Sequence, residues 1–228
     1  MESASSAGDR PRQSDFSRPV TSNQTGVHPQ LPAAVQRHLQ QPLRRPLASY
    51  SASAFARLRA ALAEQPRPLV MDSFCGTGMS TAMLAARHPE HLVVGVDQSA
   101  HRLGKHVAAG AANYLLLQAK VEDIWALMLA EGLALDHHYL LYPNPWPKGK
   151  HLQRRVHGHG SFPLLLALGG GIELRSNWQL YVEEFGVAMH LAGRHGWVSR
   201  IQGDPAITLF EAKYRDSGHP LWAYTSPP

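Results

Sequence analysis

The fold of this chain is decided by the stretch Pro68-Leu69-Val70-Met71-Asp72-Ser73-Phe74-Cys75-Gly76-Thr77-Gly78. Its apolar first half predicts a short buried strand, and its second half is a glycine turn. Gly76 and Gly78 lack side chains, so the backbone can turn sharply there and approach a ligand closely. A helix is predicted over residues 81–88, directly after the turn. The stretch is therefore a strand–turn–helix unit, which binds ligands at the end of the strand.

Strands and helices alternate along the rest of the chain. Strands are predicted over residues 92–96, 114–118, 137–142, 172–175, 198–201 and 221–225, and helices over residues 99–112 and 122–130 and from Asn177, which we expect to cap the last helix. This alternation predicts an α/β protein of Rossmann-like fold, with a mostly parallel seven-stranded sheet and helices on both faces. Polar residues directly follow four of the strands, namely Asp72, Asp97, Asn144 and the pair Ser176-Asn177. We expect them to share one ligand site.

Three segments are expected along the chain. Residues 1–30 are rich in Ser, Pro, Gln and Thr and show no periodicity, which predicts disorder. Residues 31–66 carry spaced apolar residues interrupted by Pro42 and Pro46, which predicts a helical N-terminal cap. Residues 67–228 hold the alternating pattern and form the main domain. A chain of 228 residues suits one such domain with a short extension.

The composition bounds the class of protein. Hydrophobic residues make up 44% of the chain, which is ordinary for a globular protein. The longest apolar run is too short to cross a bilayer, and the N-terminus lacks an apolar secretory segment, so a cytoplasmic protein is expected. The single cysteine, Cys75, excludes an internal disulfide and an all-cysteine metal site. We expect no metal, and we interpret Cys75 as a small residue packed in the turn.

The formal net charge is +5, and the charges are unevenly distributed. Asp and Glu are absent from residues 16–63 and again from residues 137–172, and both stretches carry several basic residues. Cations without interleaved anions favour a polyanionic partner such as nucleic acid. A solvated basic face without a partner is the alternative that charge alone leaves open.

The glycine turn and the acid after the second strand together indicate a cofactor that contains adenosine. Asp97 can accept hydrogen bonds from both ribose hydroxyls, which fits a dinucleotide or S-adenosyl-L-methionine. A dinucleotide site wants a third glycine where this chain has Thr81, and it does not need an acid at Asp72. A carboxylate at Asp72 suits the ammonium group of methionine, with a turn-forming carboxylate as the alternative. The pattern favours a methyltransferase over a dehydrogenase.

The fourth predicted strand is followed by Tyr142-Pro143-Asn144-Pro145-Trp146-Pro147-Lys148, which we name the proline loop. Its prolines fix the backbone direction and remove donors, which predicts a rigid loop presented at the site. Asn144 is then placed to orient a base, while Trp146 either stacks on the base or packs against the protein. Basic residues in and after the loop are predicted to hold phosphates, namely Lys148, Lys150, His151, Arg154 and Arg155. A flexible solvated loop is the alternative.

In these features the chain resembles the bacterial tRNA (guanine-N7)-methyltransferase family over residues 68–211. The resemblance is carried by the glycine turn at Asp72, the proline loop with Lys148-x-Lys150-His151-x-x-Arg154-Arg155, the motif Ser176-Asn177-Trp178-x-x-Tyr181, and Thr208-Leu209-Phe210-Glu211. It implies a class I methyltransferase that uses S-adenosyl-L-methionine and forms 7-methylguanosine in tRNA. The implied partner is tRNA or another RNA, and no membrane is implied.

The resemblance also implies a role for each site residue. The cofactor residues are Asp72, Gly76 and Gly78 at the methionine part, Asp97 at the ribose, Lys120 and Val121 beside the adenine, and Asn144 at the methyl group. The RNA-binding residues are Lys148, His151, Arg154, Arg155, Asn177, Thr208 and Glu211. Asn144 is the catalytic residue of this assignment, because it orients both the methyl donor and the base. A carboxylate such as Glu211 can accept from N1–H and the exocyclic amine of guanine, with a surface ion pair as the alternative role.

The chain departs from the family at four positions. The family has Asp at the positions of Asn144, Asn177 and Lys120, and Gly at the position of Phe74. Guanine N7 is an unprotonated lone pair, so methyl transfer to it requires alignment but no general base. The missing acids leave two further hypotheses open. One is a methyltransferase of another base or a small molecule, for instance at an exocyclic amine, and the other is a non-catalytic RNA-binding protein.

Overall fold

A computed structural model gives the fold and describes residues 17–41, 43, 45–108, 110–203 and 205–228. The strands are β1 (Leu69–Ser73), β2 (Leu92–Asp97), β3 (Tyr114–Gln118), β4 (His137–Leu141), β5 (Gly171–Ser176), β6 (Trp197–Arg200) and β7 (Trp222–Ser226). The helices are α1 (Leu31–Gln40), α2 (Ser49–Glu64), α3 (Met79–Arg87), α4 (Ala100–Leu103), α5 (Val121–Ala130), α6 (Phe162–Ala167), α7 (Gln179–Leu191) and α8 (Leu209–Asp216), with the 3₁₀ helices η2 (Gly149–Arg154) and η3 (Val156–Gly158). Each predicted strand is present.

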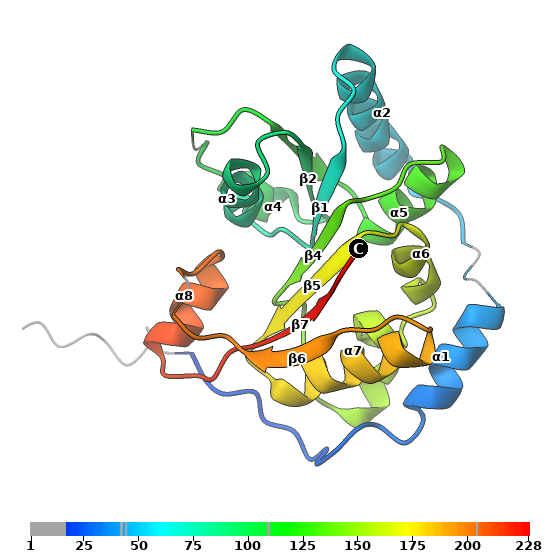
Figure 1. Ribbon diagram of the computed structural model, residues 1–228, viewed down its shortest axis with the longest axis vertical. Coiled ribbons are helices and arrows are strands. Elements are labelled where there is room, and N and C mark those ends of the chain that lie inside the picture. The colour runs from blue at the N-terminus through cyan, green and yellow to red at the C-terminus, as the bar shows by residue number, and fades with distance from the viewer. Residues whose placement is uncertain (1–16, 42, 44, 109, 204) are drawn as a thin grey trace, which may run out of the picture.

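The strands form one sheet in the order β3-β2-β1-β4-β5-β7-β6 (Figure 1). Strands β1 to β5 pair in parallel, whereas β7 runs antiparallel to both β5 and β6. The prediction of a mostly parallel seven-stranded sheet is therefore confirmed. The chain moves outward from β1 first toward β3 and then toward β6, so the strand order reverses between β1 and β4. Ligands of such sheets bind at the carboxyl ends of the strands beside this reversal.

Helices cover both faces of the sheet, because successive strand residues point to opposite sides. In β1, Leu69 and Met71 belong to the large core cluster that also includes residues of α1, α2, α5, α6 and α7. Val70, between them, belongs to a smaller cluster with Leu84 and Ala85 of α3. Figure 1 shows this division, with α3, α4 and α8 on one side of the sheet and α5, α6 and α7 on the other.

Some helical predictions differ from the structure. The helix predicted over residues 99–112 ends at Leu103, where Gly104 follows and lowers the helical propensity. Asn177 does not cap α7, which begins two residues later; its amide nitrogen instead lies 3.2 Å from Nδ1 of His219. Helices α6 and α8 were not predicted, because a short apolar run such as that in α6 has no clear periodicity.

Part of the segment predicted to be disordered, residues 17–30, is described by the structure. Residues 17–30, which we name the N-terminal strap, lie in an extended path from the end of α8 to the start of α1 (Figure 1). They are held by buried polar groups of the main domain: the backbone N–H of His28, for example, donates to Glu184 at 2.8 Å. The polar composition of the strap gives no indication of these contacts, because their partners lie far away in the sequence. Residues 1–16 lie outside the described part of the chain.

The segment predicted as a helical cap contains the helices α1 and α2, and both contribute to the large core cluster. Leu31 and Val35 of α1, and Phe55 and Leu58 of α2, are buried in this cluster. Helix α1 packs against α6 and α7, and α2 packs against α5. Among the helices that the structure describes, none is both long and apolar enough to span a membrane.

Candidate active site

A pocket of about 670 Å³ opens at the carboxyl ends of β1, β2 and β4, beside the reversal of strand order. The predicted site residues in its wall are Asp97, Val121, Asn144, Arg154 and Asn177. The wall also includes residues that the sequence analysis did not assign to the site, among them Phe74, Gln98, Trp125, Gln153, Phe210 and Tyr214. Residues that are far apart in the sequence thus meet at the edge of the sheet where a ligand was expected.

Asp72, at the end of β1, lies behind the glycine turn and is fully buried. Its Oδ2 accepts hydrogen bonds from Ser80 Oγ at 2.6 Å and Thr81 Oγ1 at 2.7 Å, which ties β1 to the first turn of α3. Among the described residues its Oδ1 has no hydrogen-bond partner. Burial raises the pKa of Asp72 to about 6, although the two hydroxyls lower it. The residue therefore forms the turn and keeps one oxygen available.

The fit around Asp72 leads to a prediction about Gly95, its neighbour across β1 and β2. A Cβ at Gly95 would lie 2.2 Å from Thr81 Oγ1 and 2.7 Å from a methyl carbon of Leu116. We expect Gly95→Ala to lower the free energy of unfolding by about 1–3 kcal/mol, because the core is overpacked and the Thr81 hydroxyl is displaced from Asp72. Urea unfolding measures this. Gly110→Ala is the control, since its Cβ would meet open space; equal stability of both variants would contradict the prediction.

The glycine turn lies beside the pocket, although neither of its predicted cofactor residues, Gly76 and Gly78, is part of the pocket wall. Gly76 and Gly78 adopt φ of 61° and 75°, and a Cβ at Gly76 would meet nothing within 4 Å. Phe74 has φ of 66°, which is uncommon for a residue with a side chain; its ring lines the pocket and meets Trp125 edge to face with centroids 6.3 Å apart. Cys75 is buried, which raises the pKa of its thiol, so it is a packed neutral residue as expected.

Asp97, at the end of β2, is buried and fixes the turn from the other side. Its Oδ2 accepts from the N–H of Gly76 at 3.0 Å. Its Oδ1 accepts from the N–H of Ser99 at 2.8 Å and lies 3.0 Å from Arg102 Nη2. A carboxylate offers about four lone-pair sites, so Asp97 keeps one site, on Oδ2, for a hydroxyl of a ribose. The next residue, Gln98, also lines the pocket, and its place after the strand was the signal that could have identified it.

The end of the pocket predicted to hold adenine is formed by Val121 and Trp125 of α5. Trp125 Nε1 donates to Ser73 Oγ at 3.2 Å, and Ser73 Oγ lies 2.8 Å from Nε2 of His138. Burial lowers the pKa of His138 to about 3, so its ring is neutral near pH 7. Lys120 is not part of the pocket wall; it precedes α5, and its backbone N–H donates to Ser51 Oγ at 3.2 Å.

The proline loop leaves β4 and presents Asn144, which is exposed, at the pocket. Tyr142 and Trp146, on either side of it, have φ of 55° and 45°. Each left-handed residue costs about 1–2 kcal/mol, so the surrounding contacts must hold the loop. The N–H of Tyr142 donates to the carbonyl of Arg175 at 2.9 Å, and the carbonyl of Trp146 accepts from Arg155. The predicted rigid presentation of Asn144 agrees with this arrangement.

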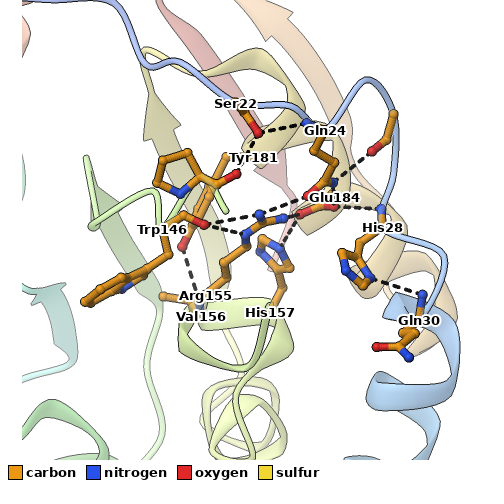
Figure 2. Close-up of polar contacts among 12 residues, drawn as sticks. Ser22, Gln24, His28, Gln30, Trp146, Arg155, Val156, His157, Tyr181 and Glu184 are labelled. Carbon is orange, nitrogen blue, oxygen red and sulfur yellow. Dashed lines mark hydrogen bonds and ion pairs between the residues drawn. The ribbon is translucent and has the colours of Figure 1, made fainter. Parts of the chain in front are cut away.

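The basic residues after the loop divide into two groups. Arg154 is exposed and its guanidinium lies over the Trp146 ring, 4.8 Å from the centroid, while Lys148 is exposed beyond the pocket wall. His151 packs edge-on against Trp146. Arg155 differs from its prediction as a phosphate-binding residue. Its side chain is fully buried and forms an ion pair with Glu184 (Figure 2). Its donors are occupied inside the protein, so it does not contact a phosphate in this conformation.

Helix α8 corrects the roles predicted for Thr208 and Glu211. Thr208 caps the helix: its hydroxyl accepts a hydrogen bond from the N–H of Glu211 at 2.8 Å. The Glu211 carboxylate is fully buried and lies 3.0 Å from both Arg175 and Arg215, so a base does not reach it. Phe210 and Tyr214 face the pocket instead, and their i, i+4 spacing was the available signal.

Comparison with known proteins places the chain in a family. The family described as "Putative methyltransferase" matches residues 66–222, and the chain belongs to it. A tRNA (guanine-N(7)-)-methyltransferase of Yersinia pseudotuberculosis is 27% identical over 169 residues, which cover 68% of this chain and 70% of that protein. One of Nocardioides sp. is 35% identical over 160 residues, which cover 66% and 63%.

Solved structures show the same fold. The 16S rRNA methyltransferase KamB has a TM-score of 0.52 and 19% identity, and the similarity covers 82% of this chain and 97% of that one. An antibiotic-related methyltransferase has a TM-score of 0.53 and 13% identity, with 81% and 97% covered. The protein is therefore a methyltransferase of the class I, Rossmann-like fold, as the sequence predicts. It is a divergent member of the family that includes the tRNA (guanine-N7)-methyltransferases.

The methyl donor of this class is S-adenosyl-L-methionine, and the residues of the pocket fit it. Asp97 retains an acceptor site for a ribose hydroxyl, and Val121 and Trp125 offer an apolar wall for a purine ring. Gly76, beside Asp97, leaves space over the turn, while Asp72 lies buried behind it and supports the turn rather than lining the pocket. Polar groups at one end and apolar ones at the other match this amphipathic cofactor.

Proposed function

We propose that this protein transfers the methyl group of S-adenosyl-L-methionine to N7 of a guanine in tRNA. The observation that carries the proposal is the position of the proline loop: it leaves β4 next to the cofactor turn and presents Asn144 at the pocket. Relatives that are 27% and 35% identical to the chain are tRNA (guanine-N(7)-)-methyltransferases, which supports this substrate. As an enzyme of tRNA it would act in the cytoplasm.

The chemistry needs little from the protein beyond alignment. The bound cofactor supplies an electrophilic methyl group on a sulfonium, which N7 attacks with its free lone pair. Holding the two atoms in line contributes much of the rate, because the reaction becomes unimolecular in effect. The amide oxygen of Asn144 is a polar group fixed between two prolines, and it can accept a hydrogen bond from the base or face the positive charge that the base gains.

The pocket rim is suited to RNA. Lys148, Lys150 and Arg154 are exposed beside the proline loop, and cations on such a rim bind phosphates. Trp146, with Arg154 above its ring, forms a flat group next to Asn144 on which a base can stack. Phe210 and Tyr214 also line the pocket, and the Tyr214 ring packs against Tyr142 of the proline loop with centroids 5.6 Å apart. A base turned out of the RNA would thus meet aromatic rings from the proline loop and from α8.

The experiment that tests the proposal uses the purified protein, tritiated S-adenosyl-L-methionine and unmodified tRNA transcripts. Nucleoside mass spectrometry of the product is expected to show 7-methylguanosine. A different methylated nucleoside would reject the guanine-N7 assignment while keeping the enzyme class. Cofactor binding without transfer to any RNA would support a non-catalytic RNA-binding protein instead.

A substitution at Asn144 separates the guanine-N7 reaction from methylation of an exocyclic amine. In the N7 reaction the base gains positive charge, and a carboxylate would stabilise the transition state. Asn144→Asp is therefore expected to raise kcat by about tenfold, which corresponds to about 1.4 kcal/mol. In the amine reaction an amide oxygen between prolines accepts the N–H of the substrate, and the same change would lower turnover. Steady-state kinetics on the tRNA substrate measures the sign, and Asp136→Asn, at the far end of β4, is the control.

A further inference from the structure

We propose that the N-terminal strap is a positioning element of the active site, which holds the proline loop in place through the buried pair Arg155–Glu184. The inference rests on the proposed function only for its effect on catalysis. Figure 2 shows the contacts: Arg155 lies between the carbonyl of Trp146 and the carboxylate of Glu184, and the strap residues Gln24 and His28 close the cluster from the other side.

The first step is the contact between Arg155 and the loop. Nε and Nη2 of Arg155 both donate to the carbonyl of Trp146, at 3.3 and 3.2 Å. Trp146 has the left-handed φ of 45°, which a tryptophan adopts only when its surroundings enforce it. The planar guanidinium fixes the direction of this carbonyl with two donors at once. The conformation of the loop that carries Asn144 therefore depends on where Arg155 is held.

The second step is the dependence of Arg155 on the strap. Its Nη1 donates to Glu184, and its Nη2 also donates to Gln24 Oε1 at 3.0 Å. Glu184 in turn accepts from Gln24 Nε2 at 2.6 Å, from the N–H of His28 at 2.8 Å and from His157 at 3.1 Å. Both Arg155 and Glu184 are fully buried. Two of the groups that satisfy Glu184 thus come from the strap, so the strap completes the cluster.

The third step is direct contact of the strap with both sides of the pocket. Ser22 Oγ donates to the carbonyl of Pro147 at 2.6 Å, at the end of the proline loop. The N–H of Ser17 donates to Ser217 Oγ at 2.8 Å, just after α8, and its carbonyl lies 3.0 Å from His219 Nε2. Figure 1 shows the strap passing from the end of α8 toward α1. It therefore joins the helix that lines one wall of the pocket to the loop that forms the other.

The test compares two strap variants with matched controls. Gln24→Ala removes a donor to Glu184 and an acceptor for Arg155, and Ser22→Ala removes the bond to Pro147. Gln30→Ala is the control for the first, since its side chain makes no capping bond at α1. Ser22→Thr, which keeps the hydroxyl, is the control for the second. The readouts are hydrogen exchange of the peptide 142–151 and the steady-state constants on tRNA.

We expect Gln24→Ala and Ser22→Ala to raise amide exchange in residues 142–151 by about tenfold, because local opening of the loop becomes easier. We also expect kcat to fall by about tenfold while KM for S-adenosyl-L-methionine stays within about twofold, because among the described residues no hydrogen bond joins the strap to Asp97, Val121 or Trp125. Gln30→Ala and Ser22→Thr should match the wild type in both readouts.

Unchanged exchange in both strap variants would overturn the proposal. Faster exchange with unchanged kcat would also overturn it, because the strap would then be structural without positioning the reacting groups. A wild-type protein that transfers no methyl group to tRNA would overturn the proposed function. In that case, faster hydrogen exchange in the strap variants would still show that the strap stabilises the proline loop, because the exchange rates of residues 142–151 do not depend on catalysis.

Discussion

Replacement of Glu184 by alanine is expected to lower the free energy of unfolding by about 3–5 kcal/mol, because it leaves the buried Arg155 without its counter-charge. Arg155 is fully buried and cannot recover this interaction from water. The change also removes the acceptor of His157, Gln24 and the backbone of His28. Urea unfolding followed by tryptophan fluorescence measures the difference.

Glu183→Ala is the matched control, since the preceding residue makes only an exposed contact with Gln179. We expect it to change the stability by less than about 0.5 kcal/mol. If Glu184→Ala and Glu183→Ala had the same stability, water would have to enter the cluster freely, and the buried pair would not organise the strap and the loop.

The stability that Glu184 contributes should depend on pH in a defined direction. Burial opposes its ionisation, but hydrogen bonds from His157 and His28 and the charge of Arg155 lower its pKa from 4.5 to about 2. A folded-state pKa below the unfolded one means that the contribution is complete above pH 4.5 and is lost as the pH falls toward 2. The stability difference between the wild type and Glu184→Gln should therefore shrink over this window. A difference independent of pH would show that the carboxylate is not stabilised as an anion.

The sequence predicted those parts of the molecule that depend on local pattern. The strand before Asp72 and the one before Asp97 are short apolar runs that end in an acid, and in a parallel sheet such ends lie side by side. The position of the pocket follows from this geometry. The rigid proline loop was predictable for a similar reason, because proline restricts the backbone whatever surrounds it.

The predictions that were wrong concern residues whose contacts lie far away in the sequence. Arg154 and Arg155 are identical in type and adjacent, yet one is exposed over Trp146 and the other is buried against α7. The partners that decide this, Glu184 and Gln24, lie 29 and 131 residues away in the sequence. The sequence after the proline loop has no periodicity that would indicate such contacts. The polar sequence of the N-terminal strap has no periodicity either.

Thr208 and Glu211 are a different case, because the signal was local and was interpreted as base recognition. Thr followed three residues later by Glu is also typical of a helix N-terminus, and the structure shows the Thr208 side chain capping α8 through the N–H of Glu211. A short helix beginning at this threonine turns Phe210 and Tyr214 toward the pocket. Aromatic rings, rather than a carboxylate, are therefore what α8 offers to a substrate.

Replacement of Asp97 by alanine is expected to weaken binding of S-adenosyl-L-methionine by about 100-fold and to reduce methyl transfer at least as much. One lone-pair site of Asp97 remains for a ribose hydroxyl, a hydrogen bond to a charged group contributes about 1.5–3 kcal/mol, and about 2.7 kcal/mol corresponds to about 100-fold. The loss is increased because Asp97 also holds the N–H groups of Gly76 and Ser99, which shape the turn around the cofactor. Calorimetric titration of the cofactor measures the affinity without RNA.

Asp97→Asn separates charge from shape, since an amide keeps one acceptor oxygen but loses the second acceptor and the charge. We expect an affinity between those of the wild type and Asp97→Ala. The control is Asp136→Ala, at the opposite end of the sheet, where the side chain is exposed and pairs with His91. Thermal unfolding of the three variants shows whether they remain folded. If a folded Asp97→Ala bound the cofactor as tightly as the wild type, the adenosine would not lie at the end of β2. The pocket at the strand reversal would then have to be assigned to the substrate alone.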